Sequence, residues 1–319
     1  MRARKSIRST SIDTFGDDDK RSTGLVLRVC RIMGLTYSSE IDPRKHADIV
    51  HVADVIKGLV ELKDTPKIGI ICGSGLGEIG DIVKDPQILP YSKIPGFPRT
   101  SVLGHKGNLV FGNLGGKYVV CLQGRFHPYE HQMNLALCAL PVRIMHELGV
   151  QIIIVSNAAG GVNENFKRGD LMLIRDHIFM PALAGFSPLV GLNGDEWGPR
   201  FVSLYNQYDN ELRAKGMEVA KQQGITMHEG VYVMNGGPQY ESAAEIEFFK
   251  RVGGDALGMS TCHEVVVARQ CGIRVIGMSL ISNIANSTAN PTHAEVIEAA
   301  REASKRACKF VEALIAVID

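Results

Sequence analysis

Several features are scarce or missing in this sequence of 319 residues, and each absence argues against one class of protein. There is no Cys-x-x-Cys pair, so a structural zinc site is not expected. The most apolar stretches, such as residues 150–155, are far too short to span a bilayer. The formal net charge is only +1, which gives no reason to expect a nucleic-acid surface. A globular protein without metal, membrane or nucleic-acid partners is the expectation.

The cysteines and the overall composition narrow the class further. The seven cysteines are odd in number and irregularly spaced, which fits a reducing compartment and predicts a cytoplasmic protein. Hydrophobic residues make up 45% and charged residues 22%, an ordinary globular composition with ample length for a large core. By length alone, the chain is one large α/β domain or two smaller ones.

Residues 1–40 differ from the rest of the chain, because Arg, Lys, Ser and Asp dominate them. This composition predicts a disordered N-terminal extension. A transit peptide and a remnant of an expression tag are the alternatives. The acidic run at residues 17–19 argues against a transit peptide, since such peptides are poor in acidic residues.

From residue 45 to residue 319, hydrophobic patterns of strand and helix alternate without a linker. Predicted strands cover residues 67–72, 109–111, 118–122, 152–155, 171–174, 230–234, 255–257 and 274–281. Predicted helices cover residues 46–62, 134–148, 210–223, 242–252, 264–271 and 294–317. The second and third strands are expected to form a hairpin, and residues 181–205 a long loop. This order predicts a single α/β domain with a twisted, mixed β-sheet flanked by helices.

A glycine-rich turn, residues 73–77, directly follows the first predicted strand. Small residues let backbone N–H groups approach an anion, and Ser74 adds a hydroxyl, so the turn is a candidate phosphate cradle. A purely structural tight turn is the alternative. The spacing Gly75-x-Gly77-x-x-Gly80 also matches the dinucleotide fingerprint, but four prolines follow where that unit requires a second strand ending in an acidic residue.

A second candidate site is Gly124-Arg125-Phe126-His127-Pro128-Tyr129, directly after a predicted strand. Alternation sends Arg125, His127 and Tyr129 to one side. An Arg and a His together suit a dianion, and a Tyr beyond them can reach a sugar hydroxyl. An ion-paired Arg beside a packed His is the alternative.

A third set of residues lies between Glu241 and Asn283, with Met259 and Ser260 between them. A carboxylate accepts hydrogen bonds, and an Asn amide both donates and accepts, so the pair can recognise the edge of a planar heterocycle. His293 begins the last predicted helix and is either a donor to a substrate hydroxyl or a polar helix-start residue. The adjacent Cys262 and His263 are not expected to form a nucleophile–base pair, because neighbouring residues on a helix point apart.

Taken together and in order, five motifs resemble the trimeric, low-molecular-mass purine nucleoside phosphorylases. They are Ile71-Cys72-Gly73-Ser74-Gly75-Leu76-Gly77, Gly124-Arg125-Phe126-His127-x-Tyr129, Asn157-Ala158-Ala159-Gly160-Gly161, Gly258-Met259-Ser260-Thr261 and Ser282-Asn283. The resemblance implies purine salvage by phosphorolysis of inosine, guanosine and their deoxy forms to free base and (deoxy)ribose 1-phosphate. It also implies a homotrimer that uses inorganic phosphate as co-substrate and needs no metal or organic cofactor.

The resemblance also assigns a role to individual positions. For phosphate it implies Ser74, His105, Arg125, His127, the Ala158 backbone and Ser260. For ribose it implies Tyr129, Met259 and His293, and for the base Tyr240, Glu241 and Asn283. The catalytic residues would be Asn283, Glu241 and His127.

Related methylthioadenosine phosphorylases carry Asp at the position of Asn283 and an apolar residue at that of His293, so these two residues point to a 6-oxopurine and a free 5′-hydroxyl. The chain departs from the usual family pattern at Leu183, Tyr240, Ser282 and His263, where Phe, Phe, Thr and Pro are usual. A phosphorylase of altered base choice, accepting methylthioadenosine or a pyrimidine nucleoside, is therefore an alternative. A non-catalytic nucleoside-binding protein is another.

Overall fold

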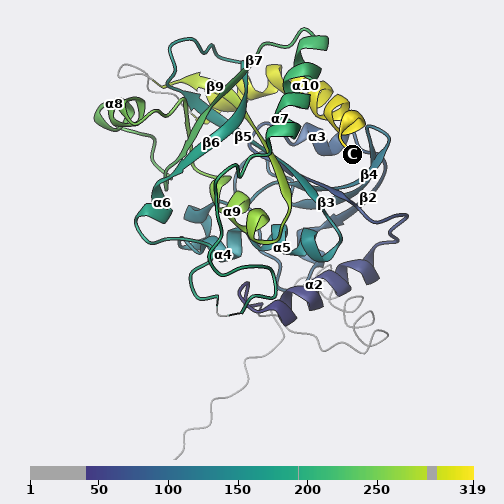
Figure 1. The fold of residues 1–319 in the computed structure, drawn as a ribbon. Coiled ribbons are helices and arrows are strands. Elements are labelled where there is room, and N and C mark those ends of the chain that lie inside the picture. Colours follow the sequence, from purple (N-terminus) through teal and green to yellow (C-terminus); the bar gives the residue numbers. More distant parts are fainter. Residues whose placement is uncertain (1–40, 193, 286–292) are drawn as a thin grey trace, which may run out of the picture.

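The computed structural model describes residues 41–192, 194–285 and 293–319 (Figure 1). The extension expected at residues 1–40 lies outside this part. The described strands are β1 (Ile68–Cys72), β2 (Lys84–Pro90), β3 (Asn108–Leu114), β4 (Lys117–Gln123), β5 (Ile152–Gly161), β6 (Leu171–Phe179), β7 (Met227–Met234), β8 (Ala256–Gly258) and β9 (Arg274–Ile284). The described helices are α2 (His46–Leu59), α3 (Glu78–Asp81), α4 (Leu135–Cys138), α5 (Leu140–Glu147), α6 (Met180–Leu183), α7 (Asn210–Gln222), α8 (Ala243–Arg251), α9 (Cys262–Gln270) and α10 (His293–Val317). Two short 3₁₀ helices, η1 (Tyr91–Lys93) and η2 (Pro128–His131), complete the set.

The strands form one mixed sheet in the order β2-β3-β4-β1-β5-β8-β7-β6-β9. Strand β9 also pairs with β5, so that β5, β8, β7, β6 and β9 close into a ring. Four neighbours, β4, β1, β5 and β9, run parallel to one another. Their carboxyl ends therefore meet at one edge, where open α/β sheets commonly bind ligands.

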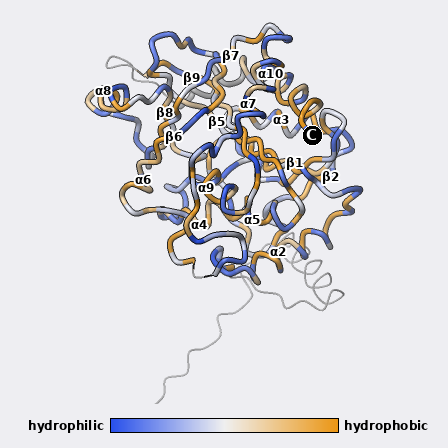
Figure 2. The backbone as a smooth tube through the Cα atoms, in the orientation of Figure 1, coloured by the Kyte–Doolittle hydropathy of each residue, from blue (hydrophilic) through white to orange (hydrophobic). Residues whose placement is uncertain are grey.

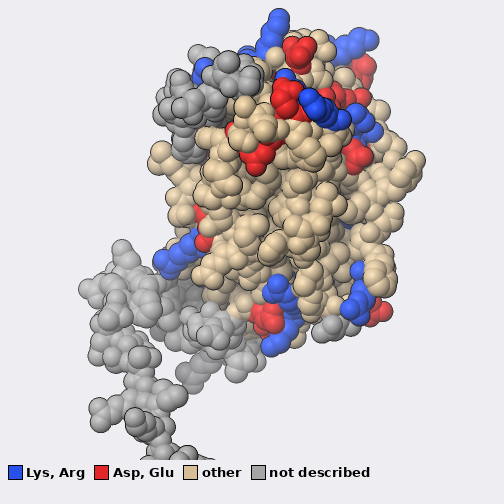
Figure 3. All heavy atoms as spheres, turned by 90° about the vertical axis from the view of Figure 1, so that its left-hand side faces the viewer, with Lys and Arg blue, Asp and Glu red and all other residues tan. Residues whose placement is uncertain are grey.

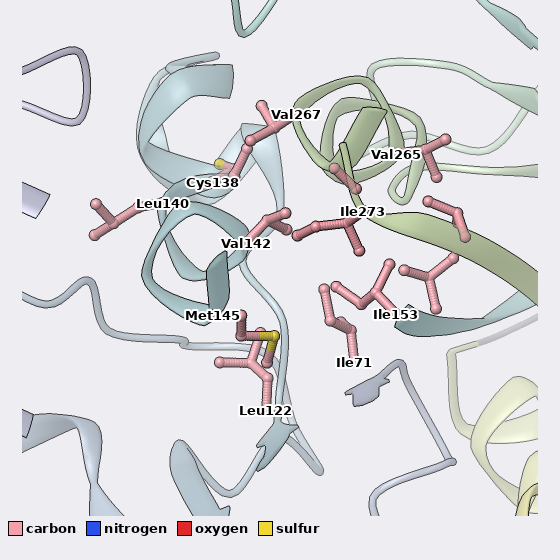
Figure 4. Close-up of a cluster of buried hydrophobic side chains, with 14 of the residues drawn as sticks. Ile71, Leu122, Cys138, Leu140, Val142, Met145, Ile153, Val265, Val267 and Ile273 are labelled. Carbon is pink, nitrogen blue, oxygen red and sulfur yellow. The ribbon is translucent and has the colours of Figure 1, made fainter. Parts of the chain in front are cut away.

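Helices cover both faces of the sheet, as the sequence predicts. Helices α3, α7 and α10 gather on one side, and α2, α4, α5 and α9 on the other (Figure 1). Successive side chains of a strand point to opposite faces of the sheet, so each strand contributes to both hydrophobic layers. Ile70 packs in the cluster with α7 and α10, and its neighbour Ile71 packs in the cluster with α5 and α9. Figure 4 shows the second cluster, where Ile71 and Ile153 point toward Val142 and Ile273.

Helix α2 illustrates how the sequence pattern places a helix on this core. Hydrophobic and hydrophilic residues alternate along it (Figure 2), and its buried positions include Ile49, Val52 and Ile56. Their spacing of three and four residues puts them on one face of the helix. In the part of the chain that the structure describes, no helix combines the length and the apolar character that a bilayer crossing requires.

Several local predictions are confirmed, and others are wrong. The hairpin of β3 and β4 forms, with Gly115 and Gly116 both at positive φ as its two-residue turn requires. The helix expected over residues 134–148 is instead two helices, because Pro141 lies in the first turn of α5 and starts a new helix. Strand β2 was not predicted; it contains Pro86 and Pro90, which are tolerated because β2 is an edge strand.

Candidate functional site

One cavity of about 250 Å³ lies at the shared carboxyl ends of the parallel strands. The predicted site residues that line it are Ser74, Arg125, His127, Tyr129, Ala158, Tyr240, Glu241, Met259, Ser260 and Asn283. His105 does not line the cavity but contacts Ser74 behind it. His293 begins α10, and its side chain lies outside the described residues.

The parallel strands explain why residues so far apart in sequence meet here. Arg125 follows β4, Ser74 follows β1, Ala158 lies in β5 and Asn283 lies in β9. Since β4, β1, β5 and β9 are neighbours in that order, these residues are spread along one edge of the sheet. The loop after β7, which contains Glu241, and the turn between β8 and α9 complete the cavity wall.

Arg125 is the buried cation at one end of the cavity. Its Nε donates to Glu264 Oε1 at 3.1 Å and its Nη2 donates to Glu264 Oε2 at 2.6 Å. Its Nη1 donates to the carbonyl oxygen of Ser156. Burial alone would lower the pKa of the guanidinium, but the Glu264 carboxylate more than offsets this and raises it. Arg125 therefore stays charged although almost no solvent reaches it.

Two histidines and a serine lie beside this cation. Nδ1 of His105 is 3.0 Å from the carbonyl oxygen of Arg125, which can only accept, so Nδ1 carries the proton and Nε2 accepts from the Ser74 hydroxyl at 3.2 Å. Burial lowers the pKa of His105 to about 4. Nδ1 of His127 is 3.2 Å from Oε2 of Glu130, and burial also lowers the pKa of His127. Both rings are therefore neutral near pH 7, and His127 keeps Nε2 as an acceptor for a proton of a bound group.

Gly73 allows the loop after β1 to approach this end closely. A Cβ atom at Gly73 would lie 2.5 Å from the carbonyl oxygen of Ser156 and 2.7 Å from Nη1 of Arg125. Neither position is compatible with a side chain, so only glycine fits without moving the backbone or the guanidinium. The loop therefore packs directly against the buried cation.

The turn between β8 and α9 is held in an uncommon conformation. Thr261 has a φ of 81°, which is rare for a β-branched residue. Its hydroxyl accepts from Nδ2 of Asn157 at 2.9 Å, and the backbone N–H of Ser260 donates to the hydroxyl oxygen of Tyr232 at 3.4 Å. Such strain persists only where surrounding contacts hold the backbone, and it is typical of functional sites. These contacts place Ser260 at the cavity wall.

The other end of the cavity carries a carboxylate and a carboxamide. Ser282 is an extra residue of β9 opposite β5, a bulge of the kind often found beside binding sites. Its hydroxyl oxygen lies 3.0 Å from Oδ1 of Asn283 and 3.2 Å from the carbonyl oxygen of Ala159, and neither contact uses the N–H groups of the Asn283 amide. Asn235 Nδ2 donates to Oε1 of Glu241, and burial raises the pKa of the Glu241 carboxyl.

Two acidic residues at the site were missed by sequence reasoning. Glu130 follows His127 by three residues and closes a capping box around η2, a pattern that local spacing could have revealed. Glu264 is 139 residues from Arg125, and no local pattern links the two. Only the tertiary structure identifies this partner of the cation.

Two other kinds of site, a Cys–His pair and a metal centre, concern the described residues. The ring nitrogens of the buried His263 have no hydrogen-bond partner among these residues, so no hydrogen bond joins its ring to the Cys262 thiol. Over the same part of the chain, no group of three or more His, Cys, Asp or Glu side chains is arranged to hold a metal ion.

Comparisons with known proteins agree with this arrangement. The family model described as "Phosphorylase superfamily" matches residues 67–316. The purine nucleoside phosphorylase of Mus musculus is 45% identical over 256 residues, covering 78% of this chain and 88% of the relative. Purine nucleoside phosphorylase 1 of Geobacillus stearothermophilus is 47% identical over 253 residues, covering 79% and 91%.

Solved structures show the same similarity in three dimensions. The Schistosoma mansoni purine nucleoside phosphorylase in complex with inosine has a TM-score of 0.83 and 44% identity, covering 88% of this chain and 99% of that chain. Isoform 2 of the same organism's enzyme, in complex with cytosine and ribose-1-phosphate, has a TM-score of 0.82 and 39% identity, covering 88% and 99%.

Replacing Gly73 with alanine should damage the cationic end of the cavity, because the new Cβ displaces either the Ser156 carbonyl or the Arg125 guanidinium. We expect inorganic phosphate to raise the melting temperature of the unchanged protein, measured by differential scanning fluorimetry, and Gly73→Ala to lose most of that stabilisation. Gly77→Ala is the matched control, because a Cβ there meets nothing closer than the Gly104 carbonyl oxygen at 3.7 Å. An unaltered phosphate response in Gly73→Ala would show that this loop does not contribute to anion binding.

Proposed function

The chain belongs to the purine nucleoside phosphorylases of the phosphorylase superfamily, and from that premise we propose that it catalyses the phosphorolysis of 6-oxopurine nucleosides. Inosine, guanosine and their deoxy forms would yield the free base and (deoxy)ribose 1-phosphate. One observation carries the choice of substrate: a single cavity has a buried guanidinium at one end and a carboxylate with a carboxamide at the other. The first suits phosphate and the second suits a heterocycle with donors and acceptors.

We propose that phosphate binds at the cationic end. The groups that contact it there are the Arg125 guanidinium, His127, the hydroxyls of Ser74 and Ser260, and the Ala158 backbone. His105 acts indirectly, since it accepts from the Ser74 hydroxyl and so fixes that group. A phosphate oxygen that carries a proton can donate it to Nε2 of the neutral His127. Phosphate is the co-substrate, and the proposal requires no metal or organic cofactor.

At the other end, Asn283 acts on the leaving group. Breaking the glycosidic bond builds positive charge on the sugar and negative charge on the purine. Ser282 contacts only the amide oxygen of Asn283, so the amide N–H groups can donate to the purine N7 as electrons enter the ring. A donor aimed at developing charge lowers the barrier more than it strengthens binding.

Glu241 gives the preference for 6-oxopurines. Its carboxylate accepts from the N1–H of hypoxanthine or guanine, which orients the base. A 6-aminopurine has a lone pair at N1, so the half-buried carboxylate would lose its partner and binding would weaken. Tyr240 stacks on the base in this assignment. Tyr129, Met259 and His293 hold the ribose, with His293 at the 5′-hydroxyl.

The direct test is hypoxanthine release from inosine, with and without inorganic phosphate. We expect release only with phosphate, and ribose 1-phosphate as the second product. The same assay with adenosine, methylthioadenosine and cytidine measures base choice, and each of these should react far more slowly than inosine. Release that is independent of phosphate would indicate a hydrolase, and a preference for cytidine or methylthioadenosine would select an altered base choice.

Substitutions at the base end should separate the two assigned roles. Asn283→Ala removes a donor to the leaving group, so its kcat for inosine should fall by about 10²–10³ with a smaller change in KM. Glu241→Ala should instead raise the KM for inosine far more than the KM for phosphate. Circular dichroism melting verifies that both variants fold. Equal losses for both substrates in Glu241→Ala would indicate general damage and contradict a specific contact with the base.

We further propose that the chain assembles as a homotrimer. Figure 3 shows that the face on the left of Figure 1, where α6 lies, is largely uncharged in its middle. Leu183 of α6 is 76% exposed, and Phe186, Val190, Phe201 and Tyr205 of the following segment are also exposed. Exposed apolar residues on a face with few charges are typical of association surfaces. Leu183 also stands where, by the family resemblance, a Phe reaches into the neighbouring site.

Sedimentation velocity tests this assembly. The mass obtained for the unchanged protein should be three times the chain mass of 34.7 kDa. Leu183→Arg should shift it toward monomer, because a charge buried in an apolar contact is costly. Val317→Arg is the control, since Val317 is also partly exposed but ends α10 on the opposite side of the molecule (Figure 1). A monomeric unchanged protein would contradict the assembly but not the activity.

We place the protein in the cytoplasm. The six described cysteines are all free and buried, with no disulfide among them. This pattern is typical of a reducing compartment, in which purine salvage from nucleosides takes place in this proposal.

A further inference from the structure

Among the described residues, Glu264 is the carboxylate that pairs with the Arg125 guanidinium. The side chains of Arg125 and Glu264 are 1% and 2% exposed, and two hydrogen bonds of 3.1 Å and 2.6 Å join them. A bidentate pair of this kind fixes the plane of the guanidinium as well as its position. Water competes little with it, because both groups are enclosed by protein.

The remaining hydrogen-bond donors of Arg125 define what it can offer a ligand. A guanidinium has five N–H groups. Glu264 accepts from Nε and Nη2, and the Ser156 carbonyl accepts from Nη1. One N–H on each terminal nitrogen is left, and Arg125 lines the cavity. The geometry points to Glu264 as a positioning residue, which holds Arg125 so that these two N–H groups bind phosphate; this inference rests on the proposed phosphorolysis.

The place of Glu264 in the fold supports this role. It lies in the first turn of α9, directly after the turn that presents Met259 and Ser260 to the cavity. Its contact with Arg125 therefore ties the loop after β4 to the β8–α9 turn, across 139 residues of sequence. Two phosphate-binding segments are thus set relative to each other by one carboxylate.

An effect of Glu264 through its charge and an effect through its position would change phosphate binding in opposite directions. Glu264 adds a negative charge near the proposed phosphate site, so its removal should strengthen phosphate binding if charge alone matters. If Glu264 instead positions Arg125, its removal should weaken phosphate binding, because the guanidinium can rotate away from the cavity. A merely structural role would lower stability and leave the substrate constants nearly unchanged.

Two variants separate these possibilities. Glu264→Gln keeps the shape but loses the charge and replaces one acceptor with a donor, whereas Glu264→Asp keeps the charge and shortens the reach by one methylene. We expect the KM for phosphate to rise at least about tenfold in both variants, with the KM for inosine changed by less than about threefold. The stabilisation of each variant by inorganic phosphate alone, measured by thermal shift, should fall in parallel.

Asp209→Asn is the matched control for loss of a bidentate ion pair. Asp209 accepts from Nε and Nη2 of Arg274 at 2.7 and 3.0 Å. Arg274 is the first residue of β9, at the end opposite to Asn283, so this pair is remote from the cavity. We expect Asp209→Asn to lower the melting temperature without changing the KM for phosphate. This variant shows what a general loss of stability does to the kinetics.

The outcomes distinguish the inference from the function on which it rests. An unchanged protein without phosphate-dependent release of hypoxanthine contradicts the proposed function itself. If the unchanged protein is active, a phosphate KM that falls or stays constant in Glu264→Gln overturns the positioning role. So does a Glu264→Asp variant that behaves like the unchanged protein, since charge would then suffice. If Glu264→Gln does not fold, the Glu264→Asp variant alone decides, because it retains a charged partner for Arg125.

Discussion

The parallel alignment of β4, β1, β5 and β9 is the constraint on which the rest of the molecule depends. Strands that run in one direction end at one edge, so the segments after them must meet there. The sheet needs helices on both faces to bury its strands, and the alternation of Ile70 and Ile71 into two clusters supplies that burial. The cavity is therefore a consequence of topology, and the site residues are those that topology delivers to it.

Within the cavity, the two ends differ in how their polar groups are held. The cationic end is almost fully buried. Three of the five N–H groups of Arg125 donate to Glu264 and Ser156, and these bonds fix the guanidinium. The base end is more open, with Tyr240 at 42% exposure and Glu241 only partly buried. In the proposed function, the rigid end suits phosphate, which has one fixed shape, and the more open end suits bases with different substituents.

Sequence reasoning predicted elements where local pattern is strong. The β-branched run at β1, the amphipathic repeat of α2 and the Gly115-Gly116 turn are each recognisable in a short window, and each forms as expected. Predictions were wrong where the effect of a proline depends on the place of its strand in the sheet. The two prolines of β2 are tolerated because that strand lies at the edge of the sheet, and edge position is a property of the assembled sheet.

The residue types of the site were determined by the sequence itself, because the glycine-rich turns and the polar residues after each strand are local features. The chemistry expected of Ser74, Arg125, His127, Glu241 and Asn283 follows from their side chains. The tertiary structure alone decided which of them meet, that Gly73 must lack a side chain, and that Glu264 pairs with Arg125. Those contacts join segments up to 139 residues apart, and a distance in space between such segments is set only when the whole sheet has closed.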